Sequence, residues 1–590
     1  ILNTLFNMII LGVSCFYHDA AAALLKDGKI IAASEEERFT RKKHDNGFPK
    51  HAIEFCLKQA GITIKDINAV IFYEKPFIKF ERILYNCIAT FPRSCLWFLK
   101  AIPAWLNRKL WFSHILEKET GYRGEVYFGD HHLSHAASSF YTSPFKEAAY
   151  LTVDGVGEWT TTSMGMAKEG HLKVLKEIHY PHSLGLLYST FTAYLQFAVN
   201  SGEYKVMGLA SYGTPKYKNL IYENLLEVKS DGSFHLNMDY FAFQHSFKSF
   251  SQKFCDLFGP VIPPEKEFTQ KAADLAASIQ KVIEEVLIKQ VNYLYTLYPS
   301  ENLCLAGGVA LNCVANAHIL RSGPFKNIYI QPAAGDAGGA VGAAYYLSAR
   351  KDIWTHAYYG SDGQEYEGQN IKTFLDEQKI PYVSFPNTQD LVRETAKQIA
   401  ENKVVGWFQG RQEFGPRALG HRSILGNPAC KDMQEILNLR IKHREKFRPF
   451  APSVLKESAN RYFEIGDIES PFMLFIAEVR PEAKKQLPAI THVDGSARLQ
   501  TVSREAEPLY HALIEEVGKQ TGFDIVINTS FNIRGEPIVR TPNEAYNCFA
   551  STDMDVLVLG NYMIIKQNLN PDKIIKVDPK KIHEHDMEII

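Results

Sequence analysis

The chain lacks the features that would assign it to several common classes of protein. Its nine cysteines are scattered among 590 residues without a CxxC pair, which argues against a disulfide framework and favours reduced thiols in a cytoplasmic protein. Lys and Arg number 65 against 66 Asp and Glu, so no excess charge indicates nucleic acid or an anionic membrane as partner. No segment approaches the ~20 apolar residues of a membrane span. The composition, with 46% hydrophobic and 22% charged residues, is typical of a globular protein of about two to four domains.

The apolar start of the chain could be taken for a signal peptide. No basic residue precedes the apolar run, so we expect a strand there rather than a leader. Met8 directly precedes that strand and is a candidate for the natural first residue.

Two histidines four residues apart organise the first half of the sequence. His131 and His135 would lie on one face of a helix, with Cβ atoms ~5–6 Å apart and Asp130 as N-cap. A buried strand over residues 148–153 would place Asp154 at its end, and two imidazoles with a carboxylate suit a divalent metal of borderline hardness. The alternative is a pair of ordinary helix histidines, because short motifs often match by chance.

A strand–turn–strand pattern occurs twice in the sequence. It runs through residues 8–34 and again through residues 148–176, and in each copy an aspartate, Asp19 or Asp154, stands at the first turn. Such a duplication describes the actin-like ATPase architecture, in which two related halves clasp a nucleotide.

Two glycine turns follow apolar strands in the second copy. Gly307-Gly308 leads from a strand over residues 302–306 into a helix, and Gly335 opens a similar turn beside Asp336. Glycines there let backbone N–H groups approach a phosphate or ribose, and a helix N-terminus favours an anion. Tight strand–helix packing explains one such turn equally well, whereas two favour a nucleotide cleft with Asp336 as a fourth metal ligand.

Basic residues of the C-terminal part lie in glycine- and proline-rich turns. A polar linker over residues 351–390 precedes a strand over residues 404–408, and the basic segments follow. Arginine forks in such turns match carbamate, carboxylate and phosphate, so we expect an anion pocket, with salt bridges in surface loops as the alternative. The segments span residues 409–423, 442–450 and 527–537, with Arg498 and Arg504 between the last two.

Residues 76–118 are rich in aromatic and basic residues. A membrane-surface helix is one interpretation of this composition. Because aromatic stripes are usually buried, the favoured interpretation is a helical insertion that covers the core or lines a cleft for an acceptor substrate.

Six segments, in order, resemble the O-carbamoyltransferases of the nodulation, cephamycin and tobramycin carbamoylation type. The resemblance runs from about Met8 to Ile565. It implies an α/β protein with a duplicated actin-like domain over 8–355, akin to the universal tRNA threonylcarbamoyl transferase. It also implies a YrdC-like α/β domain over 385–568, akin to the enzyme that makes threonylcarbamoyl adenylate. The segments are Asp130–Ser139, Ser201–Gly213, Ala306–Asn312, Phe414–Ser423, Lys446–Pro452 and Asn528–Pro537.

This resemblance implies ATP-dependent transfer of a carbamoyl group from carbamoyl phosphate to a hydroxyl. Carbamoyl phosphate would lose phosphate in the C-terminal domain, and the carbamate would attack the α-phosphorus of ATP to give carbamoyl adenylate and pyrophosphate. The adenylate would then pass to the N-terminal domain, where an acceptor hydroxyl takes the carbamoyl group. The implied metal is iron(II), although manganese or zinc would also suit the ligands, and Mg²⁺ would accompany ATP.

The resemblance also gives roles to individual residues. His18 would be the base near the acceptor hydroxyl, because the pKa of histidine lies near the operating pH. Asp19 is the second candidate base, and an ordinary turn histidine is the alternative. The metal ligands would be His131, His135, Asp154 and Asp336, and the nucleotide contacts Lys205, Gly208, Gly307, Gly308, Asn312 and Gly335. Lys446, Arg504 and Arg534 would act as catalytic residues on carbamoyl phosphate and ATP, and Arg417, Arg422, Asn528 and Ser530 would bind these substrates.

Two other functions fit parts of the sequence. A sugar kinase or ATPase of the actin-like fold would explain the glycine turns, but it leaves the paired histidines and the arginine-rich second domain without a role. A threonylcarbamoyl-type transferase acting on tRNA is disfavoured by the near-neutral charge. We therefore expect a small-molecule or sugar acceptor, which the sequence does not name. A homodimer is compatible with the sequence, and neither nucleic acid nor membrane insertion is expected.

Overall fold

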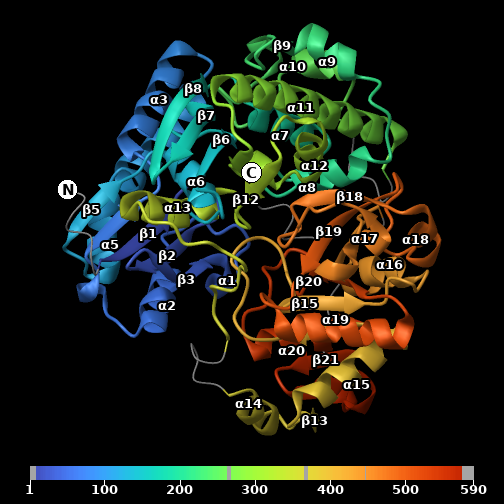
Figure 1. The fold of residues 1–590 in the computed structure, drawn as a ribbon. Coiled ribbons are helices and arrows are strands. Elements are labelled where there is room, and N and C mark those ends of the chain that lie inside the picture. Colours follow the sequence, from blue (N-terminus) through green and yellow to red (C-terminus); the bar gives the residue numbers. More distant parts are fainter. Residues whose placement is uncertain (1–7, 262–267, 364–369, 446, 575–590) are drawn as a thin grey trace. The chain divides into compact units, whose positions relative to one another are not determined.

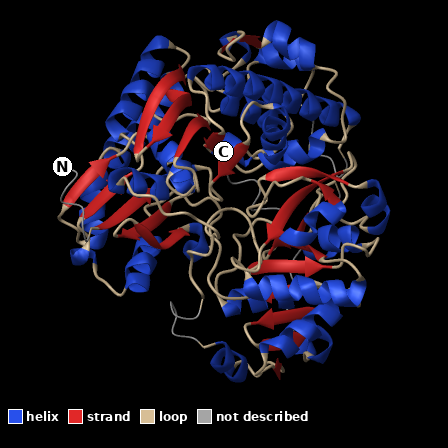
Figure 2. Ribbon diagram, in the orientation of Figure 1, coloured by secondary structure: helices blue, strands red, loops and turns tan. Residues whose placement is uncertain are grey.

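The fold comes from a computed structural model that describes residues 8–261, 268–363, 370–445 and 447–574 (Figure 1, Figure 2). The described chain divides into two compact units. Unit 1 contains His44–Trp354 and the described residues before Glu37, and unit 2 contains Glu37–Lys43 and the described residues from Thr355 onward. A short N-terminal segment therefore belongs to the second unit, which the domain limits expected from the sequence did not include.

Unit 1 is built from two five-stranded sheets with the same topology. In each sheet the first strand pairs antiparallel with the second and parallel with the fourth, the third strand pairs antiparallel with the second, and the fifth pairs parallel with the fourth. The predicted duplication is thus confirmed, and unit 1 is an actin-like domain. The sheets are β1 (Ile9–Ser14), β2 (Ala21–Lys26), β3 (Lys29–Glu35), β4 (Ala69–Phe72) and β5 (Glu125–Phe128), and β6 (Glu147–Val153), β7 (Thr160–Lys168), β8 (His171–His179), β11 (Asn302–Ala306) and β12 (Asn327–Ile330).

Helices α6 (His131–Phe140) and α13 (Asp336–Ser348) follow the last strand of each sheet and pack against each other. Alanine and glycine dominate α13, and a Cβ atom at Gly342 would lie 1.8 Å from the carbonyl oxygen of Ser134. The absence of a side chain at Gly342 therefore allows the two helix backbones to approach closely.

The remaining elements of unit 1 are mostly helices inserted between strands. Three helices separate β4 from β5, and the long α11 precedes β11. The helices are α2 (Lys50–Ala60), α3 (Pro76–Ala89), α4 (Cys95–Ala104), α5 (Phe112–Thr120), α7 (Leu184–Tyr194), α8 (Glu203–Ala210), α9 (Lys218–Asn224), α10 (Gln252–Phe258), α11 (Gln270–Leu297) and α12 (Cys313–Ser322), with a small hairpin of β9 (Leu226–Val228) and β10 (Phe234–Leu236).

Local expectations for unit 1 are met at one motif and corrected at another. The side chain of Asp130 caps α6 by accepting a hydrogen bond from the N–H of Leu133 at 3.2 Å, as predicted. The glycines at 202, 208 and 213 suggest a turn around Lys205 and Gly208, but these two residues lie in the helix α8. Local glycine content misled here because α8 is stabilised by packing against α11 rather than by its own propensity.

Unit 2 is an α/β domain around a ten-stranded mixed sheet. Strand β20 alternates its side chains between the two faces: Val526 packs beneath α15 and α19, whereas Ile525 and Ile527 enter the core on the opposite face. The more specific YrdC-like fold stays a prediction. The strands are β13 (Val383–Ser384), β14 (Val405–Phe408), β15 (Arg422–Gly426), β16 (Ala451–Leu455), β17 (Phe463–Glu464), β18 (Phe475–Val479), β19 (Ser496–Val502), β20 (Ile525–Ser530), β21 (Val556–Leu559) and β22 (Tyr562–Ile565).

The N-terminal helix α1 (Glu37–Thr40) is part of this second unit. Arg38 donates to the carbonyl of Gly415 at 2.7 Å, and Arg41 donates to the carbonyl of Pro537 at 2.8 Å. The other helices are α14 (Ile371–Glu377), α15 (Thr388–Ala400), α16 (Met433–Glu435), α17 (Ala459–Tyr462), α18 (Pro481–Gln486), α19 (Pro508–Thr521) and α20 (Pro542–Ala550).

All nine cysteines are free thiols. Within the described ranges, none of the helices combines the length and the apolar character needed to cross a membrane.

Candidate functional site

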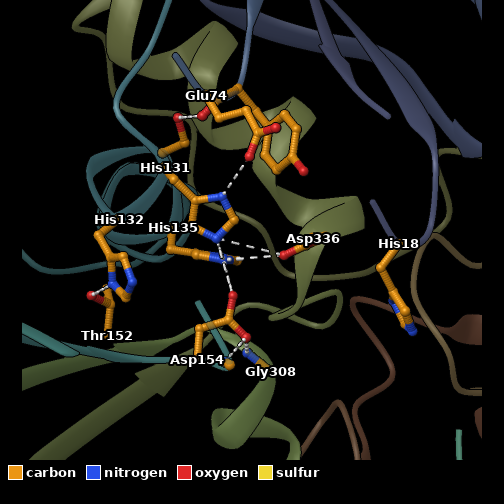
Figure 3. Close-up of polar contacts among 12 residues, drawn as sticks. His18, Glu74, His131, His132, His135, Thr152, Asp154, Gly308 and Asp336 are labelled. Atoms are coloured by element: carbon orange, nitrogen blue, oxygen red, sulfur yellow. Dashed lines mark hydrogen bonds and ion pairs between the residues drawn. The ribbon is translucent and has the colours of Figure 1, made fainter. Parts of the chain in front are cut away.

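Four side chains predicted as metal ligands meet in unit 1 (Figure 3). Nε2 of His131 lies 3.0 Å from Oδ2 of Asp154, and Nε2 of His135 lies 3.3 Å from the same oxygen. The two nitrogens lie 3.7 and 3.5 Å from Oδ1 of Asp336. One donor atom from each of the four side chains falls within 4.8 Å of the other three, so one ion is able to contact all four.

The internal duplication explains why these side chains converge. His131 is the first residue of α6 and Asp336 is the first residue of α13, and the two helices occupy equivalent places after the two sheets. His135 follows His131 by one helical turn. Asp154 directly follows β6, where its Oδ1 accepts a hydrogen bond from the N–H of Gly308 at 3.2 Å. That contact leaves the other carboxylate oxygen of Asp154 directed at the two histidines.

The donor set fits a divalent metal ion. Nε2 of His131 and Nε2 of His135 lie 3.1 Å apart in a fully buried site, and a shared cation would satisfy both lone pairs. Oδ2 of Asp336 is buried without a hydrogen-bond partner among the described residues, as expected of an oxygen that serves a ligand. Two imidazoles and two carboxylates suit iron, manganese or zinc, so the geometry favours a transition metal without naming it.

Glu74 is a member of this site that the sequence analysis missed. It lies two residues beyond β4, its Oε2 is 3.5 Å from Nδ1 of His131, and Lys79 pairs with the same oxygen at 2.6 Å. Burial alone would raise the pKa of Glu74, but the charge of Lys79 and the hydrogen bond to His131 lower it to about 2. An ionised carboxylate behind a ligand imidazole fixes the orientation of the ring and strengthens it as a donor. Its position just after a buried strand, like that of Asp154, was the available signal.

His18 lies in a chain of hydrogen bonds beside the metal-ligand cluster. Its Nδ1 is 2.7 Å from Asp19, its Nε2 is 2.9 Å from the carbonyl oxygen of Asn200, and Asp19 also contacts His44 at 2.7 Å. Burial would lower the pKa of His18, but the adjacent Asp19 and its hydrogen bond raise it to about 10. Both ring nitrogens face oxygen acceptors, an arrangement that favours the imidazolium form, and that form has no lone pair to accept a proton.

The predicted nucleotide contacts lie near the cluster or on helices linked to it. Gly307 follows β11 with φ of 89°, and a Cβ atom there would lie 2.3 Å from the carbonyl of Val153, so this position requires glycine. Gly335 is the N-cap residue of α13. Asn312 caps α12 and exchanges hydrogen bonds with Gln280 of α11 at 2.9 and 3.2 Å.

Helix α8 contacts the start of α12 through a neighbour of the predicted residues Lys205 and Gly208. Met207, between Lys205 and Gly208, touches Cys313, which directly follows Asn312. The side chain of Lys205 is buried and lies over the ring of Phe197, with Nζ 5.5 Å from the centroid. The structure thus brings α8 to the start of α12, the region where the nucleotide was predicted.

In unit 2, Lys442 is a buried cation to which the sequence analysis gave no role. Its Nζ donates to the carbonyl of Ser530 and lies 2.7 Å from Oδ1 of Asn532. Burial, followed by the charge of Arg444, lowers the pKa of Lys442 well below its usual value. Nζ also donates to the carbonyl of Asn532 at 2.9 Å, so at least three protein oxygens accept from Lys442. A nearby anion would favour the charged form of this lysine.

Other basic residues gather around the loop that contains Lys442. Arg534 donates to the carbonyl of His443 at 3.4 Å, and its guanidinium lies 3.5 Å from Glu445. Arg448 contacts the same carboxylate at 2.6 Å. Since one glutamate serves two arginines, this cluster can accommodate the charge of a phosphate or carbamate. Lys446, predicted to be catalytic, lies outside the described residues.

Comparison with known proteins identifies the family. Residues 9–345 match the family model for the carbamoyltransferase N-terminus, and residues 396–566 match that for the carbamoyltransferase C-terminus. The chain belongs to the carbamoyltransferase family. It is therefore an enzyme that transfers a carbamoyl group.

Similar proteins cover nearly the whole of this carbamoyltransferase. An uncharacterised Synechocystis protein, sll1178, is 50% identical, covering 94% of this chain and 96% of its own. The nodulation protein NolNO of Sinorhizobium fredii is 37% identical, covering 94% and 80%. An uncharacterised protein of Methanocaldococcus jannaschii, MJ1058, is 31% identical, covering 94% and 99%. The similarity thus extends over both units.

Two arginines predicted to hold substrate in this carbamoyltransferase have other environments. Arg504 is exposed and pairs with Glu515 on the surface at 3.3 Å, so it does not join the basic cluster. Arg422 is fully buried over the ring of Phe408, and its NH1 and NH2 groups donate to backbone carbonyls, including that of Gln409. One side chain thus faces water and the other stabilises the loop before β15, and neither lies in the cluster around Lys442. Their roles toward substrate stay predictions.

The remaining predicted substrate residues differ in how close they lie to Lys442. Ser530 lies next to Lys442, as its carbonyl contact shows. Asn528 is buried, and its amide donates to Gln500 at 2.9 Å within the sheet. Arg417 is half-buried in the loop between β14 and β15. Ser530 and Arg534 are therefore the predicted residues that the structure places beside the newly found Lys442.

The metal assignment leads to a direct prediction. His135→Ala removes one of four ligands, and we expect metal content measured by plasma mass spectrometry to fall at least tenfold from about one ion per chain. The matched control is His132→Gln on the same helix, because His132 faces Thr152 at 2.7 Å instead of the cluster. Equal metal content in wild type and His135→Ala would contradict the assignment.

Proposed function

We propose that this carbamoyltransferase uses ATP and carbamoyl phosphate to make carbamoyl adenylate, and then carbamoylates a hydroxyl of a small molecule or sugar. The observation that carries the proposal is the buried cluster of His131, His135, Asp154 and Asp336 beside the N–H of Gly308. A sugar kinase of the actin-like fold would have no need for two buried imidazoles at this position. The bound metal would act as a Lewis acid toward the phosphate or carbonyl oxygen.

The activation step is assigned to unit 2. Water would hydrolyse carbamoyl phosphate, its oxygen going to the released inorganic phosphate and the broken P–O bond leaving carbamate. An oxygen of the carbamate would then form a bond to the α-phosphorus of ATP as the bond from that phosphorus to pyrophosphate breaks. Lys442, Arg448 and Arg534 would stabilise the phosphate oxygens on which negative charge develops. Their proximity around one loop supports this assignment.

The transfer step is assigned to unit 1. The acceptor oxygen would bond to the carbamoyl carbon, AMP would leave with the electrons of the broken bond, and the hydroxyl proton would pass to His18. Because the imidazolium form of His18 holds a proton on both nitrogens, it must first lose the proton that it shares with the carbonyl of Asn200. Asp19 would then hold the neutral ring in the tautomer that presents Nε2 to the acceptor.

Phosphorus NMR tests the proposal without knowledge of the acceptor. The full-length protein, loaded with Fe²⁺ under anaerobic conditions and supplied with Mg²⁺, ATP and carbamoyl phosphate, is expected to form pyrophosphate only when both substrates are present. Formation of ADP and phosphate alone would instead assign a kinase-like ATPase activity.

Single substitutions should separate the two steps. His131→Ala is expected to retain pyrophosphate formation and lose metal, whereas Lys442→Gln should slow pyrophosphate formation by roughly 10²-fold with the metal retained. Arg504→Gln is the control for the basic cluster, and it should leave the rate unchanged because Arg504 is exposed. Loss of pyrophosphate formation in His131→Ala would show that the two steps are not divided between the units in this way.

The pH dependence of transfer tests the role of His18. A base whose pKa is raised to about 10 is increasingly deprotonated as pH rises, so the transfer rate should increase with pH up to that value. Asp19→Asn removes the charge that raises this pKa, and the rising limb should shift to lower pH by more than ~1 unit. The transfer rate of the wild type and of Asp19→Asn is measured from about pH 6 to pH 10 under otherwise identical conditions. An unshifted limb would exclude His18 as the base.

A further inference from the structure

Helix α3 exposes most of its large apolar side chains and buries most of its polar ones. The exposed residues are Phe77, Ile78, Leu84, Tyr85 and Ile88, together with Glu81 and Ala89. Lys79, Arg82 and Asn86 are buried on the other side of the helix, beside the apolar Ile83 and Cys87. Large apolar side chains exposed along a full helix are costly in water, so they indicate a surface that is covered by something else.

The buried face of α3 is held by polar contacts. Lys79 pairs with Glu74 at 2.6 Å, and the guanidinium of Arg82 lies over the ring of Tyr180, 4.8 Å from its centroid. Asn86 donates to the carbonyl of Gln244. These contacts fix the rotation of the helix about its axis, so the exposure of the apolar side chains follows from the fold and not from loose packing.

The chain after α3 continues the exposed apolar surface. Phe91 and Leu96 are 71% and 77% exposed, and Phe98 and Leu99 of α4 are exposed as well. The aromatic stretch was expected to cover the core or line a cleft, yet only part of it does so. Trp105 is buried in a small core between the helices, together with Ile83, Cys87, Ile102 and Leu110.

Ring contacts join the helices into one surface, which we call the α3–α4 face. The rings of Phe77 and Trp111 lie 6.3 Å apart, linking the start of α3 to the chain after α4. Nζ of Lys100 lies 5.1 Å from the ring centroid of Phe247, itself exposed, which extends the face beyond the insertion.

The charge of this region is positive. Between Lys75 and Leu116 the sequence has seven Lys or Arg and a single acidic residue, Glu81. Lys79 and Arg82 are buried, and the guanidinium of Arg108 lies 5.4 Å from the ring centroid of the buried Phe16. Arg93 and Lys100 are exposed cations that lie close in sequence to Phe91 and Leu99 of the apolar surface. Exposed Phe, Leu and Trp combined with Lys and Arg on one helical surface are typical of elements that lie in the interface of an anionic membrane.

We propose that the α3–α4 face docks on the surface of a membrane that contains anionic lipid. The apolar side chains enter the boundary between headgroups and acyl chains, and Arg93 and Lys100 contact lipid phosphates. A second protein chain is the competing occupant, but it would have to supply acidic side chains to match these cations, whereas the lipid surface supplies its phosphates uniformly. This inference is independent of the proposed reaction.

Vesicle co-sedimentation of the full-length protein tests the inference. The protein is expected to bind vesicles of phosphatidylcholine mixed with phosphatidylglycerol, and to bind phosphatidylcholine vesicles at least tenfold more weakly. Phe91→Ser, Leu96→Ser and Leu99→Ser combined should reduce the partition coefficient by roughly tenfold or more. Arg93→Gln with Lys100→Gln should reduce it by roughly fivefold per cation.

The matched control replaces exposed apolar residues outside this face. Ile353 and Val493 are 55% and 58% exposed, and Ile353→Ser with Val493→Ser should leave vesicle binding unchanged. Pyrophosphate formation and the thermal unfolding midpoint, measured for every variant, establish that the protein is folded. Light scattering measures whether the triple variant alters the oligomeric state.

Any one of three results would overturn the proposal. The first is a wild-type protein that binds neither kind of vesicle, and the second is one that binds both kinds equally and independently of salt. The third is a triple variant that binds as tightly as the control variant. A triple variant that turns a dimer into a monomer, with no vesicle binding by the wild type, would assign the α3–α4 face to a second copy of the chain.

Discussion

Close backbone packing around α13 is the constraint on which the site in unit 1 depends. A Cβ atom at Gly342 would lie 1.8 Å from the carbonyl of Ser134 in α6, and one at Gly12 would lie 2.0 Å from the carbonyl of Ala340. With glycine at both contacts, α13 is wedged between α6 and β1. Its first residue, Asp336, is thereby fixed against the histidines of α6, and side-chain flexibility plays little part in assembling the cluster.

The two units gather charged side chains of different kinds. Unit 1 brings two carboxylates together with two imidazoles, a set that would suit a cation, whereas unit 2 gathers Lys442 with arginines, a set that would suit an anion. Glu74 extends the first arrangement outward, because it lies behind His131 and pairs with Lys79 of α3. Lys79 is thus buried on the face of α3 that also carries Arg82 and Asn86, which contact Tyr180 and Gln244. These contacts orient α3 and leave most of its large apolar side chains exposed.

Local sequence patterns were sufficient to predict the site residues whose positions are set by a helix or by the end of a strand. The spacing of His131 and His135 needs only a helix, and Asp154 and Asp336 need only the ends of strands and the starts of helices. The basic residues of unit 2 lie in loops, where spacing does not set direction. Arg504 proved to be exposed and Arg422 to be held by carbonyls, while Lys442, four residues before the predicted Lys446, is the buried cation. Burial depends on packing between distant segments, so no local pattern reports it.

The sequence by itself determined the duplicated strand–turn–strand units, the histidine pair on α6, the glycine at position 307 and the membership of a family with two domains. Only the tertiary structure decided that residues 37–43 belong to unit 2, that Glu74 lies behind His131, that the contacts of His18 favour its imidazolium form, and that α3 leaves most of its large apolar side chains exposed. The physical reason is the range of the interactions. Helix and strand periodicity act between near neighbours in sequence, whereas pKa, burial and the rotation of a helix depend on contacts that only the complete fold creates.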